Sequence, residues 1–200
     1  MIPSLRKGTL TKIPGRRRMQ RVAVYCGSSS GHDARFMALA SAFGSALAAA
    51  GFGLVYGGGQ VGLMGAVARG AIASGGEVIG VIPRFLEGKE IISSADPRVQ
   101  LRVVDSMHER KAVYYELAHA FVALPGGLGT LEEIFETLAW AHLGLLRGPI
   151  ILLNDGGYYD DVVSLLDRAV VAGFASARSR ALISAEATVA RAIAVLSSVG

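Results

Sequence analysis

The residues best suited to chemistry in this sequence stand together in the segment PGGLGTLEE, at positions 125–133. The segment follows an apolar run and precedes a helical pattern, so it is typical of a turn between a strand and a helix. Glycine lets backbone N–H groups approach an anion, and the start of the next helix adds unpaired N–H groups at a positive dipole end. We therefore expect a phosphate-binding turn with contacts from Gly126, Gly127, Gly129 and Thr130.

Two carboxylates follow this turn directly, at Glu132 and Glu133. Acidic side chains in the first turn of a helix are ordinary partners of the helix dipole, and this explanation is sufficient for Glu136. It is incomplete for the other two, because a carboxylate beside a bound anion costs free energy unless it has a function. An ionised carboxylate held by N–H groups can orient water or stabilise a developing cation, but it is a poor proton donor.

Two more turns have the same character. CGSSSG (26–31) and GGGQVGLMG (57–65) also come directly after apolar runs. One such turn is weak evidence, since tight turns use glycine in any case. Three of them in one sheet indicate a nucleotide or another polyanion. The contacts expected from these two turns are Ser28, Gly58 and Gly59.

Two common nucleotide sites are disfavoured by what surrounds these turns. Gly57, Gly59 and Gly62 match G-x-G-x-x-G, but the strand predicted at 77–82 does not end on the acidic residue that a dinucleotide site requires. No turn carries the lysine of G-x-x-x-x-G-K-[ST], which disfavours a triphosphate site. A phosphate turn that lacks this lysine suggests a monophosphate ligand.

A helix predicted after the segment VQLRVV brings basic side chains to the same edge of the sheet. Ser106 and Glu109 have the spacing of a capping box, which places Arg110 and Lys111 in or just past the first helical turn. The alternative is that these charges are a solvated surface. The four histidines show no ligand spacing, so no metal site is expected.

Short apolar runs alternate with helical patterns along most of the chain. Strands are predicted at 21–26, 53–57, 77–82, 99–104, 120–124 and 149–153, and the last helix is predicted from about 185 with Ser184 as its cap. The runs lack polar alternation, which is typical of strands buried on both faces. This pattern predicts an α/β fold: a single doubly wound, Rossmann-like, mostly parallel sheet with helices on both faces. Ligands bind such sheets beyond the carboxyl ends of the strands.

Composition and charge limit the remaining possibilities. The 200 residues fit one domain, and 52% of them are hydrophobic, which excludes a disordered chain. The positive charge gathers in residues 1–20, a predicted flexible extension, and leaves 21–200 roughly neutral, so no nucleic-acid partner is expected. Cys26 is the single cysteine, and no apolar run reaches about 18 residues. We expect a cytoplasmic protein without a membrane partner.

The motifs together resemble the Lonely Guy (LOG) family of cytokinin riboside 5′-monophosphate phosphoribohydrolases. The motif PGGxGTxxE is complete from Pro125 to Glu133, and Arg110 and Lys111 follow Met107 as the family's basic pair does. CGSSSG, VYGGGQVGLMG, VIGVIP and LLNDGGYYD also look like family segments in the family order. The resemblance covers roughly residues 21–198.

This resemblance implies a Rossmann-like homodimer that hydrolyses the N-glycosidic bond of an N6-modified adenosine monophosphate, without a metal or organic cofactor. By motif position Arg110 and Glu133 take the catalytic places, and their division of labour stays open. The resemblance also implies substrate contacts from Glu90, Met107, Lys111, Glu132 and the segment 126–130.

Three alternatives remain at this point. The chain could be a general purine nucleoside-monophosphate nucleosidase that acts on AMP, or a non-hydrolytic nucleotide carrier or sensor on the same fold. A carrier would be expected to lack the arginine and glutamate pair, which this chain has. Members of the family have often been labelled lysine decarboxylases, but Lys89 and Lys111 are the only lysines after residue 12 and give no argument for a pyridoxal-phosphate site.

Overall fold

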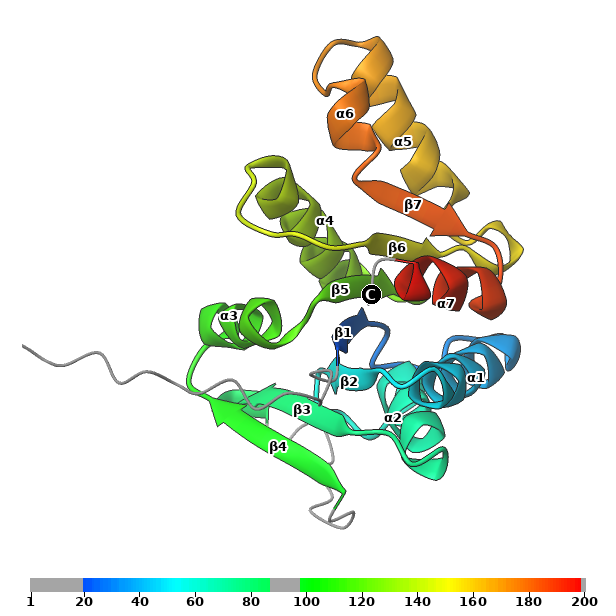
Figure 1. The fold of residues 1–200 in the computed structure, drawn as a ribbon, viewed down its shortest axis with the longest axis vertical. Coiled ribbons are helices and arrows are strands. Elements are labelled where there is room, and N and C mark those ends of the chain that lie inside the picture. The colour runs from blue at the N-terminus through cyan, green and yellow to red at the C-terminus, as the bar shows by residue number, and fades with distance from the viewer. Residues whose placement is uncertain (1–19, 87–97, 199–200) are drawn as a thin grey trace, which may run out of the picture.

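The structure, a computed structural model, describes residues 20–86 and 98–198. Its centre is one seven-stranded sheet in the order β4-β3-β2-β1-β5-β6-β7, and every neighbouring pair is parallel (Figure 1). The strands are β1 (Arg21–Tyr25), β2 (Gly53–Tyr56), β3 (Val78–Pro83), β4 (Val99–Val104), β5 (Ala120–Ala123), β6 (Ile150–Leu153) and β7 (Ile183–Glu186). The predicted α/β fold class is confirmed, and this sheet is parallel throughout.

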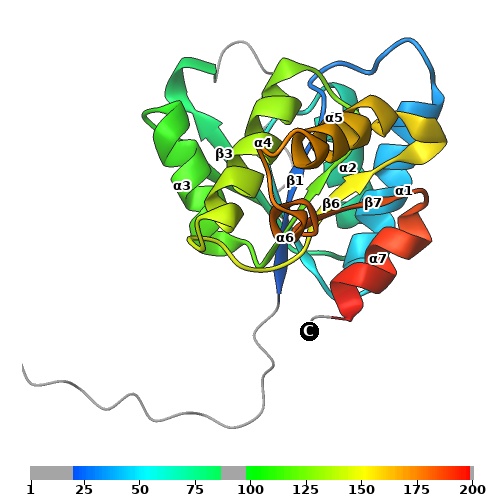
Figure 2. The ribbon, with the colours of Figure 1, turned by 90° about the horizontal axis from the view of Figure 1, so that it is seen from above.

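Helices cover both faces of the sheet, as Figure 2 shows for α1 and α7 on one side and α3 and α4 on the other. One layer holds α1 (Arg35–Ala49), α2 (Gly62–Ala73) and α7 (Val189–Ser197), and the other holds α3 (Met107–Leu117), α4 (Leu128–His142) and α5 (Asp160–Val171). Three short helices complete the described elements: η1 (Arg84–Leu86), η2 (Asp155–Gly157) and α6 (Ala177–Arg180). None of the helices in the described ranges is both long and apolar enough to cross a membrane.

Successive side chains of β1 serve the two hydrophobic cores in turn. Val22 and Val24 pack with α1, α2 and α7, whereas Ala23 and Tyr25 pack with α3 and α4. Because both faces of a central strand are buried, β1 is apolar at every position after Arg21. The strand predicted at 99–104 is present as the edge strand β4, but most of its residues are exposed, so the expected burial on both faces is wrong for this strand. At this edge of the sheet only the two end residues of the strand pack against a core, Val99 against one and Val104 against the other.

The prediction for the end of the chain is wrong. The segment around Ser184 is the strand β7, which pairs with β6 from Ile150↔Ile183 to Leu153↔Glu186. The last helix begins later, at Val189, where the Thr188 hydroxyl accepts a hydrogen bond from the N–H of Arg191 at 3.3 Å. Pairing with a distant strand overrides the helix propensity of the alanines here, because it satisfies the backbone groups of β6.

The strand order changes direction at β1, which lies between β2 and β5. The turns that follow β1 and β5 are therefore side by side, and the Gly27 N–H donates to the Pro125 carbonyl at 3.1 Å. In sheets of this type the crevice at such a reversal is the usual ligand site. The fold thus brings the CGSSSG and PGGLGT turns to one place.

Helices α1 and α2 cross at two glycines. A Cβ on Gly44 would lie 2.1 Å from the Val67 carbonyl oxygen, and one on Gly70 would lie 2.1 Å from the Ser41 carbonyl oxygen. We expect Gly44→Ala to lower the free energy of unfolding by about 2 kcal/mol, because rigid backbone must move apart. Urea denaturation measures this. Gly129→Ala, whose Cβ meets open space in α4, serves as the control and should unfold at the wild-type midpoint or above it.

Candidate functional site

A cavity of about 260 Å³ opens beyond the carboxyl ends of the central strands. Its walls come from the turns after β1, β2 and β5 and from the first turns of α3 and α4, so segments far apart in the sequence share it. Most of the predicted site residues line it: Ser28, Met107, Arg110, Gly127, Gly129, Thr130, Glu132 and Glu133.

The other predicted site residues lie elsewhere. Gly126 lines an adjoining cavity of about 200 Å³ with Tyr158, whose hydroxyl donates to the Gly126 carbonyl at 2.7 Å. Gly58 and Gly59 line neither cavity. Of the segment 57–65, Gly57 and Met64 line the larger cavity and Leu63 lines the adjoining one. Lys111 points into a neighbouring ion-pair cluster, and Glu90 lies outside the described residues.

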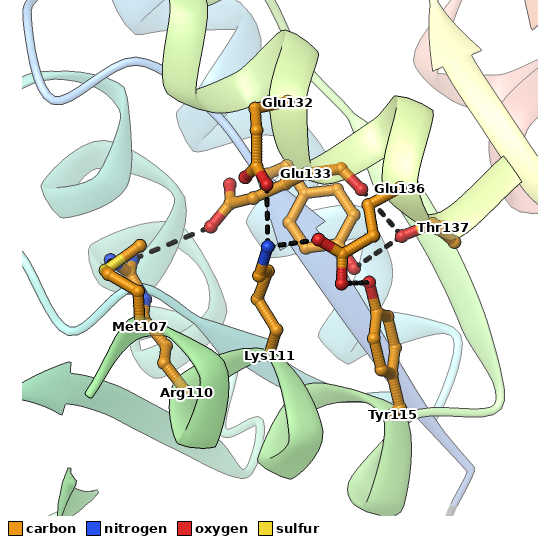
Figure 3. Close-up of polar contacts among 9 residues, drawn as sticks. Met107, Arg110, Lys111, Tyr115, Glu132, Glu133, Glu136 and Thr137 are labelled. Carbon is orange, nitrogen blue, oxygen red and sulfur yellow. Dashed lines mark hydrogen bonds and ion pairs between the residues drawn. The ribbon is translucent and has the colours of Figure 1, made fainter. Parts of the chain in front are cut away.

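Helix α3 presents Arg110 to the cavity, and the predicted capping interaction is present at its start. The Ser106 hydroxyl accepts a hydrogen bond from the Glu109 N–H at 3.1 Å, and the Glu109 carboxylate accepts one from the Asp105 N–H at 2.8 Å. Arg110 is buried, and its Nη2 lies 3.9 Å from Oε1 of Glu133 (Figure 3). A cation and a carboxylate therefore face each other inside a largely desolvated wall.

The sequence pattern predicts the glutamates in the first turn of the helix, but helix α4 begins before them. Its first residue is Leu128 and its N-cap is Gly127, so the glutamates lie beyond the first turn and are not ordinary partners of the helix dipole. The first turn instead contains Gly129 and Thr130, and the first N–H groups of a helix have no partner within it. The motif thus forms a helix start of the kind that can bind an anion, with the buried Glu133 about one turn further along.

Lys111 bridges α3 and α4 through two carboxylates. Its Nζ contacts Oε1 of Glu132 at 2.6 Å and also Oε2 of Glu136, and the Tyr115 hydroxyl donates to Oε1 of Glu136 at 3.2 Å (Figure 3). Burial acts to lower the pKa of Lys111, but the two carboxylates outweigh it and raise the pKa above its ordinary value. Lys111 therefore stays charged and holds the two helices together. Glu136 is part of this cluster and is not merely a dipole partner.

Several cavity residues were missed by the sequence analysis: Tyr25, Cys26, Gly57, Met64 and Tyr114. Tyr25 and Cys26 end the first strand, so the rule that ligands bind beyond strand ends could have found them. Tyr114 stands four residues after Arg110, the spacing at which helical side chains meet. Burial raises the pKa of the Cys26 thiol and of the Tyr114 phenol, so both groups are neutral. A neutral thiol is a poor nucleophile.

Among the described residues, no group of three or more histidine, cysteine, aspartate or glutamate side chains is placed to hold a metal ion. The cavity offers instead two carboxylates (Glu132 and Glu133), one guanidinium and the N–H groups of a helix start. Such a set can bind a phosphate and stabilise charge that develops close to it.

Comparison with known proteins identifies relatives of this chain. A family model described as "possible lysine decarboxylase" matches residues 64–196. Cytokinin riboside 5′-monophosphate phosphoribohydrolase LOG of Oryza sativa subsp. japonica is 45% identical over 168 residues, covering 84% of this chain and 69% of the relative. The enzyme of the same name from Rhodococcoides fascians is 46% identical over 164 residues, covering 81% of each chain.

Two molybdenum cofactor proteins are among the solved structures of similar fold. The molybdenum cofactor carrier protein of Chlamydomonas reinhardtii has a TM-score of 0.66 at 23% identity and covers 90% of this chain and 97% of its own. The molybdenum cofactor binding protein of Rippkaea orientalis has a TM-score of 0.66 at 22% identity, covering 92% and 99%. At such identity the likeness shows the fold alone.

Proposed function

This chain belongs to the family that includes these phosphoribohydrolases, and from that premise we propose that it hydrolyses cytokinin riboside 5′-monophosphates. The bond broken is the N-glycosidic bond, and the products are the free cytokinin base and ribose 5-phosphate. The observation that carries the proposal is the buried pair of Arg110 and Glu133, which face each other at 3.9 Å beside an anion-binding helix start.

The geometry supports a division of roles within the cavity. The N–H groups at the start of α4 bind the 5′-phosphate, and this binding places the anomeric carbon near Glu133. As the base leaves, the ribose gains oxocarbenium character, which the Glu133 carboxylate stabilises while it orients the attacking water. Arg110 faces the same carboxylate, so we assign it to the departing base.

The cluster around Lys111 has a supporting role in this proposal. Its two ion pairs connect α3 to α4. They therefore keep the helix that carries Arg110 at a fixed position relative to the helix that carries Glu133. Glu132 lies at the edge of the cavity, half exposed, and can contact the ribose. Ser28 and Met107 complete the wall that surrounds the nucleotide.

The direct test is incubation of the purified protein with isopentenyladenosine 5′-monophosphate and, separately, with AMP. We expect free isopentenyladenine and ribose 5-phosphate from the first, with a higher kcat/KM than for AMP. Release from AMP alone would make the protein a general purine nucleotide nucleosidase. Binding of either nucleotide by calorimetry without any release would indicate a carrier or sensor. Chromatography of the base measures the outcome.

The lysine decarboxylase description of the family model is not part of the proposal. A Schiff-base lysine requires a lowered pKa, whereas the carboxylates around Lys111 raise it. The only other lysine after residue 12 is Lys89, which lies outside the described residues.

A substitution at Gly57 tests whether the placement of Arg110 matters. A Cβ here would lie 2.3 Å from Nη2 of Arg110 and 2.6 Å from Sδ of Met64, so Gly57→Ala pushes the guanidinium aside. We expect kcat/KM to fall about 10- to 100-fold, because a shift of about 1 Å disturbs the reacting geometry. Thermal unfolding is the control and should change little, since flexible side-chain ends can move. Wild-type kcat/KM in this variant would contradict the assignment of Arg110.

We further propose that the chain acts as a homodimer, with the outer surface of α4, α5 and α6 as its interface. A groove of about 220 Å³ between these helices is lined by Phe135, Leu138, Leu166 and Phe174, and the Phe174 side chain is 91% exposed. Exposed apolar surface of this kind is typical of protein contacts. Analytical ultracentrifugation of the wild type and of Phe174→Glu would show whether this face carries the dimer.

The remaining expectations are proposals of the same kind. We propose that residues 21–200 form the catalytic unit and that the only partners are the nucleotide and a second copy of the chain, with no nucleic acid, membrane or cofactor. A cytoplasmic location agrees with Cys26, a single buried cysteine that requires no oxidising compartment.

A further inference from the structure

Arg110 is fixed by a tyrosine one helical turn further along α3. Its Nε donates a hydrogen bond to the Tyr114 hydroxyl oxygen at 2.8 Å, and its Cζ lies 5.6 Å from the centre of the Tyr114 ring. The Tyr114 side chain is 1% exposed and reaches the cavity wall. Because a guanidinium is planar, a bond to Nε sets the direction of its two outer nitrogens. One of these is the Nη2 that faces Glu133.

Tyr114 is itself held by residues of β1 and α4. Its ring packs against the ring of Tyr25 at 5.7 Å, and the Tyr25 hydroxyl bonds to Oγ1 of Thr137 at 3.0 Å. Oγ1 of Thr137 donates its single proton to the Glu133 carbonyl at 2.8 Å, so Tyr25 must be the donor to Thr137. A continuous buried chain of contacts therefore runs from Arg110 through β1 to the backbone of Glu133.

We propose that Tyr114 is a positioning residue for the hydrolysis, and that its hydroxyl oxygen orients the guanidinium of Arg110 toward Glu133 and the departing base. The inference rests on the proposed function and goes beyond the motif, which does not include this position. Burial, which raises the pKa of the Tyr114 phenol, keeps the group neutral, so it accepts the Arg110 hydrogen bond as a hydroxyl. A merely structural tyrosine would act through its ring alone.

Tyr114→Phe separates the two roles, because it keeps the ring and removes only the oxygen. We expect kcat to fall about 10- to 100-fold with KM changed less than about threefold, since the guanidinium loses its orientation and not its charge. The matched control is Tyr115→Phe, the adjacent tyrosine, whose hydroxyl contacts Glu136 outside the cavity. The kcat and KM of Tyr115→Phe should stay within about threefold of the wild-type values. An unchanged kcat in Tyr114→Phe would overturn the proposal.

A double variant tests the link to Arg110 directly. Lysine at position 110 has no Nε–H equivalent, so Tyr114→Phe should cause no further loss in the Arg110→Lys background. Losses that multiply in the double variant would show that Tyr114 acts independently of Arg110, and they would reject the proposal.

The orientation can also be read without any turnover. In ¹H–¹⁵N NMR spectra of arginine side chains, the Arg110 Nε–H signal should exchange slowly and is assigned by its absence from Arg110→Lys. We expect Tyr114→Phe to accelerate its exchange about tenfold or more, while Tyr115→Phe leaves it unchanged. If the exchange rate of the Arg110 Nε–H proton is the same in Tyr114→Phe as in the wild type, the inference is overturned. A wild-type protein that hydrolyses no nucleotide would instead contradict the proposed function, and the NMR result would still decide the positioning.

Discussion

Glu133→Gln is expected to lower kcat about 1,000-fold while nucleotide affinity stays within a few-fold of wild type. Glutamine has the size of glutamate and keeps the hydrogen-bonding shape of the wall, but it carries no negative charge. The loss should therefore appear in the step where the ribose becomes positive, and not in binding at the start of α4. Base release measures kcat, and calorimetry with the substrate measures affinity.

Glu136→Gln is the matched control for this prediction. Glu136 lies on the same helix, but its carboxylate contacts Lys111 and Tyr115 and does not line the cavity. We expect its kcat within about fivefold of wild type. If both variants lost turnover equally, the effect would come from weakened packing of α3 on α4 and not from a catalytic carboxylate.

Arg110→Lys is expected to lower kcat/KM about 100- to 1,000-fold, because lysine offers a point charge in place of a planar fork. The hydrogen bond to Tyr114 and the approach to Glu133 would both be lost. If Arg110 assists the departing base, the loss should fall mainly on kcat. It should also be much smaller with a nucleotide whose purine is methylated at N7, since that base departs without a proton.

The opposite pattern would assign Arg110 to the phosphate. In that case Arg110→Lys raises KM with little change in kcat, and the N7-methylated substrate is affected as strongly as the ordinary one. Arg168→Lys, at an exposed position on α5, controls for the exchange of arginine for lysine and should leave both constants unchanged.

The central part of the fold could be predicted from the sequence because of where its strands lie. Strands β1, β2, β3, β5 and β6 are buried on both faces, so each one is a continuous apolar run that local reading detects. β7 has the sequence ISAE and no such run. Its identity as a strand depends on hydrogen bonds to β6, about thirty residues away, which local propensity does not report.

The motif PGGLGTLEE, the basic residues after Met107 and the sheet edge at which both lie can be recognised from the amino-acid sequence alone. Parallel strands place their following turns at one edge, so the meeting of Arg110 and Glu133 could be expected. The ion pairs of Lys111 with Glu132 and Glu136 become visible only in the folded protein. The tertiary structure alone also shows that Tyr114 holds the guanidinium and that α4 starts within the motif. These side-chain contacts depend on how α3 packs against α4 beside β1. That packing cannot be predicted from the spacing of residues along the chain.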